Sequence, residues 1–266
     1  MKVALIQLNS TSDMEKNYKK FLYFLELSKA NKADLVIFPE NTFYIGKIDN
    51  YKKIAEKFKK DYLPEILNEV KSHGLDIILG GVPFLKTEKE LVNRLLYINS
   101  DGVIEKYYDK IHLFQIDNSN SSLNEAAYLT RGNEIVTIEK HGFILGFSIC
   151  YDLRFPEIYR ALIDRGANVL IIPAAFTYKT GKLHWVELLR ARAIENQSYV
   201  FGVNQVGEHE NYGKSYGVTS VVKPVGEIIS LNDTDEDVLF FDLIKSDIEK
   251  FRHWIPALDN RVKFKK

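Results

Sequence analysis

Apolar stretches of strand length alternate along the chain with stretches of helical periodicity. Residues 14–30 form the clearest helical stretch, because Tyr18, Phe21 and Leu25 would lie on one face. Further helices are predicted over residues 51–72 with an interruption near Pro64, over 156–165 ending at Gly166, and over 184–197. The predicted strands cover residues 3–8, 35–38, 77–79, 143–149, 169–172, 199–203, 218–222, 227–230 and 238–242.

Two further strands are predicted as a hairpin. Residues 95–98 and 103–107 are apolar enough for strands, and the turn sequence Asn-Ser-Asp-Gly at 99–102 separates them. The pair Gly80-Gly81 is expected to break the strand that begins at residue 77. Alternating helices and strands with antiparallel pairs favour a layered α/β domain with mixed sheets. No linker-like or repeated segment stands out, so we predict a single domain over residues 1–266.

Composition limits the classes of partner and the cellular location that we expect. Lys+Arg and Asp+Glu both total 36, so the formal net charge is zero. This balance argues against nucleic acid or an anionic membrane as a partner, because both attract clustered positive charge. Residues 1–9 become polar too soon for a secretory signal, and no apolar run reaches the roughly 18 residues of a membrane span. We therefore expect a cytoplasmic protein. Its one cysteine excludes an internal disulfide and a multi-cysteine metal site.

Three polar residues follow apolar strands at the points where those strands end. Glu40 follows the strand 35–38, Lys110 follows the hairpin, and Cys150 follows residues 143–149. Functional side chains in α/β proteins gather at strand ends, where a rigid scaffold holds them clear of the core. The strand-then-helix context of Cys150 is typical of a nucleophile elbow, in which a helix start helps to stabilise thiolate.

These residue types could perform acyl transfer together. A thiolate attacks an amide carbonyl, a carboxylate carries protons, and an ammonium group stabilises the oxyanion. The backbone N–H of Tyr151 could be a second oxyanion donor. Each residue also has an ordinary structural interpretation: a buried cysteine, a loop carboxylate and a solvated lysine. Composition and spacing alone leave both interpretations open.

Around these residues the sequence resembles the nitrilase superfamily of carbon-nitrogen hydrolases. Within it, the chain resembles the group of Nit-type omega-amidases and deaminated glutathione amidases. The matching blocks, in order along nearly the whole chain, are FPE at 38–40, YDKIHLF at 108–114, ICYDLRFPE at 149–157, PAAF at 173–176, TGKLHW at 180–185 and RARAIENQ at 190–197. The blocks are specific as an ordered set, whereas any one of them alone would be weak.

The resemblance implies a four-layer αββα sandwich with mixed sheets and a Glu–Lys–Cys triad at Glu40, Lys110 and Cys150. It places a second glutamate, Glu125, where a carboxylate could orient Lys110 and keep it charged. It also implies that neither a metal nor a cofactor is needed and that the protein forms homodimers. Its substrate would be a small-molecule amide.

The same blocks suggest residues that contact the substrate. Tyr151, Arg154, Phe176 and Thr177 flank the triad in the sequence or follow a strand end. We expect them to form the wall of the pocket. Arg154 could bind a substrate carboxylate or could form an ion pair that supports the elbow.

The expected reaction is hydrolysis of a small linear amide to an acid and ammonia through a thioester on Cys150. Dicarboxylate monoamides such as alpha-ketoglutaramate are the leading substrates. Deaminated glutathione, an N-carbamoyl amine and a nitrile are alternatives with the same triad. Relatives commonly have Tyr-Gly-His-Ser where this chain has Val218-Thr219 in the last two positions. The substitution leaves the triad untouched and leaves the Nit subgroup open.

Two other functional classes would make different demands on these residues. A Cys–His hydrolase would need His112, His141 or His184 within hydrogen-bond reach of the sulfur. A non-catalytic interaction protein on the same fold would have an inert thiol. A phosphate-binding loop is excluded, because Gly181-Lys182 is not followed by serine or threonine and lacks the required upstream glycine.

Overall fold

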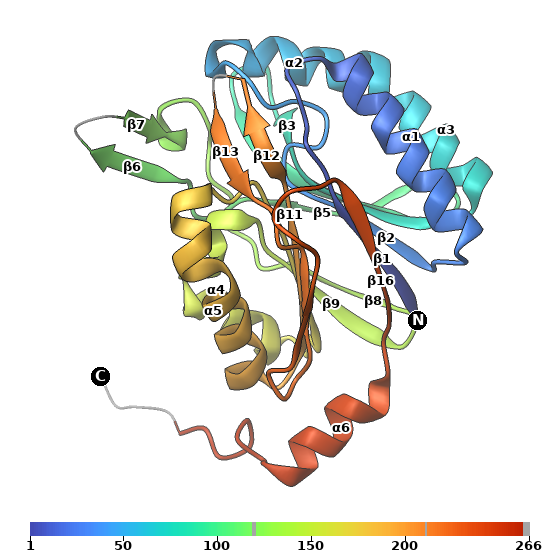
Figure 1. Cartoon of the computed structure of the whole chain (residues 1–266), viewed down its shortest axis with the longest axis vertical. Helices are drawn as coiled ribbons and strands as arrows, with labels where there is room; N and C mark the ends of the chain where they lie inside the picture. Colours follow the sequence, from blue (N-terminus) through green and yellow to red (C-terminus); the bar gives the residue numbers. More distant parts are fainter. Residues whose placement is uncertain (119–120, 211, 263–266) are drawn as a thin grey trace.

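Two mixed six-stranded sheets face each other between layers of helices in the computed structural model of the chain (Figure 1). The structure describes residues 1–118, 121–210 and 212–262, apart from the side chains of 117–118 and 121–123. The arrangement confirms the predicted α/β sandwich with mixed sheets.

The first sheet has the strand order β16-β1-β2-β3-β4-β5. Its strands β1, β2 and β3 run parallel, while β16, β4 and β5 pair antiparallel with their neighbours. The bounds are β1 Lys2–Gln7, β2 Leu35–Phe38, β3 Asp76–Leu85, β4 Leu91–Ile98, β5 Ile104–Asp109 and β16 Asp237–Asp242. The predicted hairpin is therefore confirmed as β4 and β5.

The second sheet repeats this plan with the order β15-β14-β11-β10-β9-β8. Three parallel strands, β9, β10 and β11, again lie at its centre. The bounds are β8 Thr137–Lys140, β9 Phe143–Phe147, β10 Val169–Ala174, β11 Tyr199–Asn204, β14 Ser220–Val222 and β15 Ile228–Ser230. Two small hairpins stand apart from both sheets: β6 Gln115–Asn118 with β7 Ser121–Asn124, and β12 Val206–His209 with β13 Gly213–Tyr216.

Helices cover the outer face of each sheet (Figure 1). On the first sheet lie α1 Met14–Ala30, α2 Tyr51–Lys57 and α3 Leu63–His73, and on the second lie α4 Pro156–Asp164 and α5 Tyr178–Asn196. A last helix, α6 Lys245–Trp254, extends beyond the sandwich. Shorter helical segments are Ile48–Asn50, the π-helical Phe58–Tyr62, Glu125–Ala127 and Cys150–Arg154.

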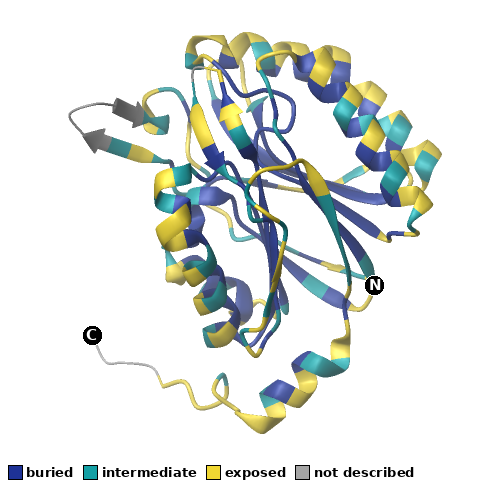
Figure 2. Cartoon of the chain, viewed as in Figure 1, coloured by how far each residue is buried: buried dark blue, intermediate teal, exposed yellow. Residues whose placement is uncertain are grey.

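The central strands are apolar on both faces because both faces are covered. In β1, Val3 and Leu5 belong to the core between the sheets, whereas Ala4 and Ile6 pack toward α1 and α3. Parallel strands buried on two sides read as continuous apolar runs, as seen in the sequence. Figure 2 shows the sheets as the buried centre, with exposed positions on the outer sides of the helices.

Helix α1 has the bounds that its periodicity predicts. Asp13 caps its N-terminus by accepting hydrogen bonds from the backbone N–H groups of Glu15 and Lys16. Such a cap satisfies donors that have no partner within the helix. Phe21 and Leu25 are fully buried on the face toward the sheet.

The predicted break at Gly80-Gly81 is wrong. Strand β3 continues to Leu85 through a bulge at the two glycines. A Cβ atom on Gly80 would lie 2.0 Å from the Cβ of Pro173 in the second sheet, and Gly81 has a φ of +59°. The glycines therefore allow close contact between the sheets rather than ending the strand.

One helix prediction, the interruption near Pro64, is confirmed in outline, and another needs correction. The stretch 51–72 is interrupted by the π-helical segment Phe58–Tyr62, and Pro64 lies in the first turn of α3, where proline is tolerated. Helix α5 begins at Tyr178 rather than at residue 184. The hairpin β12–β13 and helix α6 were not predicted.

The central parallel strands of both sheets end at the same edge of the sandwich. An isolated bridge between Leu8 and Gln205 joins the sheets just beyond β1 and β11. The Gln205 side chain also donates a hydrogen bond to the backbone oxygen of Glu40, at 2.9 Å. This edge therefore holds strand ends from both sheets in one rigid region. Among the helices in the described ranges, none is long and apolar enough to cross a membrane.

Candidate active site

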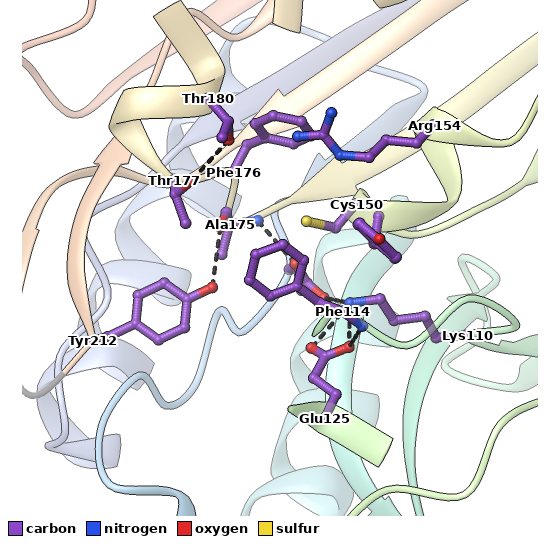
Figure 3. A pocket seen from close by; sticks show the side chains of 12 residues that line it. Lys110, Phe114, Glu125, Cys150, Arg154, Ala175, Phe176, Thr177, Thr180 and Tyr212 are labelled. Carbon is purple, nitrogen blue, oxygen red and sulfur yellow. Dashed lines mark hydrogen bonds and ion pairs between the residues drawn. The ribbon is translucent and has the colours of Figure 1, made fainter. Parts of the chain in front are cut away.

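Four side chains expected in the site meet at one pocket at this edge (Figure 3). Glu40 follows β2, Lys110 directly follows β5, Cys150 follows β9, and Glu125 begins a short helix after β7. We call these four side chains the floor of the pocket. The other lining residues form the wall, namely Phe114, Tyr151, Arg154, Ala175, Phe176, Thr177, Thr180 and Tyr212.

Lys110 lies between two carboxylates. Its Nζ is 2.9 Å from Oε1 of Glu40 and 2.9 Å from Oε2 of Glu125, and the side chain is 1% exposed. Burial opposes the charge of Lys110, but the carboxylates of Glu125 and Glu40 outweigh it and raise its pKa well above the usual range. Lys110 therefore remains an ammonium ion at neutral pH.

Glu40 is held by contacts from both sheets. Its Oε1 accepts hydrogen bonds from Nδ2 of Asn93, at 2.8 Å, and from Lys110. Its Oε2 accepts the backbone N–H of Ala175, at 2.9 Å. Asn93 lies in β4 and Ala175 directly follows β10, so the carboxylate has one defined orientation.

Glu125 contacts Lys110 from the opposite side. Its Oε2 also accepts the backbone N–H of Phe114, at 2.7 Å. Burial raises the pKa of Glu125, while Lys110 opposes that rise. The structure thus brings Glu125 to the position that the family resemblance implied.

Cys150 lies in the sharp turn expected from its sequence context. Its φ is +47°, in the left-handed region that non-glycine residues seldom occupy. Such a conformation costs on the order of 1–3 kcal/mol and is common at functional sites. Burial, with the Glu40 carboxylate adding to it, raises the pKa of the Cys150 thiol, and Lys110 opposes the rise. The raised pKa favours the neutral thiol, contrary to the stabilised thiolate expected from the helix start, so the sulfur needs a base to become a nucleophile.

Asp152, which was not singled out from the sequence, joins the lysine and cysteine segments. It is fully buried and accepts hydrogen bonds from the hydroxyl of Tyr108 at 2.7 Å and the backbone N–H of Ile149 at 2.9 Å. It also accepts the backbone N–H of His112 at 2.9 Å. A carboxylate two residues after the cysteine was visible in the sequence, but its partners are distant in the chain.

The three histidines of the Cys–His alternative make their hydrogen bonds elsewhere. Nδ1 of His112 lies 2.7 Å from Oδ1 of Asp152, and Nε2 of His141 lies 3.1 Å from Oδ2 of Asp76. Nδ1 of His184 contacts Arg154 at 3.2 Å. Within the described residues none of them hydrogen-bonds the sulfur, so the geometry does not support that alternative.

Arg154 places a cation at the wall of the pocket. Its guanidinium lies over the ring of Phe176, 4.9 Å from the centroid, and over Tyr151 at 5.9 Å. Of the carboxylates in the part of the chain that is described, none lies within 4.0 Å of it. The ion pair that could have supported the elbow is therefore not formed.

The remaining wall residues come from the segment after β10 and from the β12–β13 hairpin. Thr177 precedes α5, and its hydroxyl lies 2.8 Å from that of Thr180. Tyr212, in the turn of the hairpin, donates its hydroxyl to the backbone oxygen of Ala175, at 3.1 Å. Tyr212 was missed, because nothing in its polar surroundings in the sequence marks it.

Thr219, at the position where the sequence departs from the pattern expected of the family, supports the wall indirectly. The Thr219 hydroxyl accepts the backbone N–H of Asn204, at 3.0 Å. The Asn204 side chain in turn accepts the backbone N–H of Phe176, at 2.9 Å. The threonine therefore serves as the hydrogen-bond acceptor at this position.

A thiol, two carboxylates and an ammonium group in one small pocket are the set needed for thiol-dependent acyl transfer. Among the described residues, no group of three metal-binding side chains forms a candidate metal site. The fold is an αββα sandwich, and its site holds a buried cysteine. Together they indicate a hydrolase.

Comparison with known proteins identifies the family. The carbon-nitrogen hydrolase profile matches residues 2–253, and the chain belongs to that family. The deaminated glutathione amidase of Dictyostelium discoideum is 34% identical over 98% of this chain and 93% of its own length. Omega-amidase NIT3 of Saccharomyces cerevisiae is 33% identical, with the same two coverages.

Solved structures agree with this assignment. The Caenorhabditis elegans NitFhit protein superposes with a TM-score of 0.92 at 33% identity, covering 98% of this chain. The present chain spans 64% of that protein. Saccharomyces cerevisiae Nit3 superposes with a TM-score of 0.83 at 30% identity, covering 96% of this chain and 94% of its own. The resemblance to the nitrilase superfamily is thus confirmed, and the protein is a carbon-nitrogen hydrolase acting on bonds other than peptide bonds.

Proposed function

We propose that the protein hydrolyses a small linear amide that carries a carboxylate, such as alpha-ketoglutaramate, through a thioester on Cys150. The observation that carries the proposal is the meeting of Glu40, Lys110 and Cys150 in one pocket with Glu125 behind the lysine. This arrangement provides a nucleophile, a proton carrier and a fixed positive charge in surroundings with little water.

In the first half-reaction, Glu40 takes the thiol proton while the sulfur attacks the amide carbon. The carbonyl oxygen becomes negative next to Lys110 Nζ and the backbone N–H of Tyr151. Glu40 then gives the proton to the amide nitrogen, the C–N bond breaks, and ammonia leaves the thioester behind. A neutral thiol at rest fits this sequence, because the raised pKa of Cys150 makes a neighbouring base necessary.

In the second half-reaction, a water molecule replaces ammonia. Glu40 takes a proton from the water, whose oxygen attacks the thioester carbon. The same oxyanion donors stabilise the second tetrahedral intermediate, the carboxylic acid leaves, and the proton returns to the sulfur. Glu125 keeps Lys110 charged and in place throughout.

Arg154 supports a substrate with a carboxylate at its far end. It is a pocket-lining cation whose described neighbours are aromatic rings and a histidine. A guanidinium binds carboxylate with two parallel hydrogen bonds. Deaminated glutathione is a second candidate, favoured by the 34% identity to an amidase of that name. An N-carbamoyl amine or a nitrile would use the same floor.

The exposed apolar side chains support a homodimer. Leu183 and Ile194 on α5 are 68% and 45% exposed, and Trp254 at the end of α6 is 73% exposed. A dimer interface that covered these side chains would remove their apolar surface from water. We place the dimer in the cytoplasm, where reducing conditions keep a catalytic thiol free. Light scattering in solution should give twice the mass of the chain, and a monomer would contradict this part of the proposal.

The direct test is ammonia release from alpha-ketoglutaramate, deaminated glutathione, a simple aliphatic amide, a nitrile and an N-carbamoyl amine, with Cys150→Ala beside the wild type. If the wild type hydrolyses one of these compounds and Cys150→Ala does not, the result supports the proposal and identifies the substrate. For deaminated glutathione, the released dipeptide is measured instead of ammonia. An inert, unreactive thiol would favour a non-catalytic interaction protein.

A further inference from the structure

The pocket has two chemically different ends (Figure 3). Arg154 and Thr180 line one end, together with Phe176. Glu125 lies at the other end, and Glu40 lies near it because both carboxylates contact Nζ of Lys110 at 2.9 Å. The amide nitrogen must face Glu40 if that carboxylate is to protonate it, so the carboxylate end is the leaving-group end. The acyl chain then extends toward Arg154.

A second cavity lies behind the leaving-group end. It has room for about one water-sized molecule. Its lining residues are Asn41, Tyr51, Pro83, Asn93, Phe114, Glu125, Tyr128, Leu129 and Tyr212. Phe114, Glu125 and Tyr212 line both cavities and therefore form the partition between them. Glu125 is fixed by Lys110, so the two aromatic rings are the parts of the partition that fill space.

Tyr212 is tied to the same backbone unit that orients Glu40. Its hydroxyl donates to the oxygen of Ala175, whose N–H donates to Oε2 of Glu40. Burial, followed by the Glu40 carboxylate, raises the pKa of Tyr212 well above the usual range, so the hydroxyl remains a donor. The ring is thereby held at a fixed position across the pocket from Arg154 (Figure 3).

We propose that Tyr212 closes the leaving-group end and restricts this hydrolase to amides that release ammonia. The inference rests on the proposed function and deepens it. Alpha-ketoglutaramate and deaminated glutathione share the same acyl group, and hydrolysis of each consumes one water. Their leaving groups differ, being ammonia in the first and the dipeptide cysteinylglycine in the second. The closed end therefore selects alpha-ketoglutaramate.

The test compares kcat/KM for alpha-ketoglutaramate, its N-methyl and N-propyl derivatives, and deaminated glutathione. The wild type should discriminate against the N-propyl derivative by at least about 100-fold, because each misfitting methylene costs about tenfold or more. Tyr212→Ala should join the two cavities. The ratio of kcat/KM for alpha-ketoglutaramate to kcat/KM for the N-propyl derivative should then fall by at least about tenfold. Deaminated glutathione should improve relative to alpha-ketoglutaramate in the same variant.

Matched variants separate the ring from other effects. Tyr212→Phe keeps the ring and should retain the wild-type ratio. Tyr128→Ala removes a ring that lines only the second cavity, so the partition and the ratio should persist. A primary amide with one extra methylene in its acyl chain should gain nothing from Tyr212→Ala, because its extension points the other way.

Three results would overturn the inference. The first is a wild type that hydrolyses the N-propyl derivative or deaminated glutathione with the same kcat/KM as alpha-ketoglutaramate. The second is a Tyr212→Ala protein that keeps the wild-type ratio. The third is a Tyr128→Ala protein in which the ratio falls as much as expected for Tyr212→Ala. All three leave the proposed function intact, whereas a wild type that hydrolyses none of the amides would overturn both. If circular dichroism shows that Tyr212→Ala does not fold, Tyr212→Val takes its place with the same expectations.

Discussion

The floor and the wall of the pocket differ in how firmly the fold holds them. Glu40 and Lys110 are each 1% exposed, and each makes several charged or hydrogen-bonded contacts. Among the described residues, Arg154 and Tyr212 in the wall each make one side-chain hydrogen bond, to His184 and to the backbone oxygen of Ala175. The chemistry is therefore built on rigid strand ends, while selectivity depends on a few contacts from a turn and a hairpin.

This difference predicts different kinetic effects. Changes in the floor should act mainly on kcat, because those groups interact with charge that develops during the reaction. Changes in the wall should act on KM or on the choice of substrate, because those groups bind parts that do not react. The variants below test this separation from the largest expected effect to the smallest.

Cys150→Ala should show the largest effect. Removing the nucleophile should lower kcat by about 10⁶-fold, to background, as for other enzymes that lose a nucleophile. Cys150→Ser should come close to the same loss, since the hydroxyl is a far weaker nucleophile in this setting. Ammonia release measures both, and residual turnover near the wild-type rate would show that the sulfur is not the nucleophile.

Lys110→Ala should lower kcat by about 10²–10³-fold with little change in KM, because it removes an oxyanion donor. It also leaves Glu40 and Glu125 buried without their cation, which costs about 3–5 kcal/mol of folding free energy. Thermal unfolding must therefore accompany the kinetics. Lys52→Ala, at an exposed helix position, is the matched control. An unchanged kcat in folded Lys110→Ala would refute the oxyanion role.

Arg154→Gln should act on binding. A charge-assisted hydrogen bond contributes about 1.5–3 kcal/mol, so KM for alpha-ketoglutaramate should rise by about 10–150-fold at similar kcat. An aliphatic amide without a carboxylate should keep its KM. Equal effects on the two amides would mean that Arg154 supports the fold rather than the substrate.

Glu125→Gln should have the smallest effect and show it in the pH profile. The raised pKa of Glu125 means that it takes up a proton above the ordinary glutamate value of about 4.3. As the pH falls through that raised pKa, Lys110 loses a charged partner and kcat falls. The free energy of folding depends on pH in the opposite direction from kcat. Because the pKa of Glu125 is raised in the folded state, its protonation stabilises the fold at low pH, and this stabilisation is lost as the pH rises through the raised pKa. Glu125→Gln should move the acid limb of kcat to lower pH, and an unshifted limb would contradict the assignment.

The sequence singled out three of the four floor residues, Glu40, Lys110 and Cys150, because they follow apolar strands. The strand at residues 35–38 and the helix at 14–30 have the predicted bounds, so Glu40 was placed correctly. Glu125 follows no such strand, and only the family resemblance indicated it. The catalytic roles of all four floor residues, and the single domain over 1–266, stay predictions.

The missed wall residue and the incorrect fold predictions have the same physical cause. Gly80-Gly81 was interpreted as a strand end because a glycine pair does not reveal that another sheet will approach it. Gly181 similarly lies within α5, where the ring of Tyr216 covers it. Tyr212 belongs to a short polar hairpin with no periodicity. Its role comes from contacts with residues far away in the chain, which local patterns do not encode.

The central claim is a covalent acyl group on Cys150. Wild-type protein at saturating alpha-ketoglutaramate should be quenched in acid within the first turnovers, and its mass and peptide map measured. The account predicts the mass increase of one acyl group on the peptide that contains Cys150, and none in Cys150→Ala. Turnover without any adduct, together with an active Cys150→Ala protein, would contradict it.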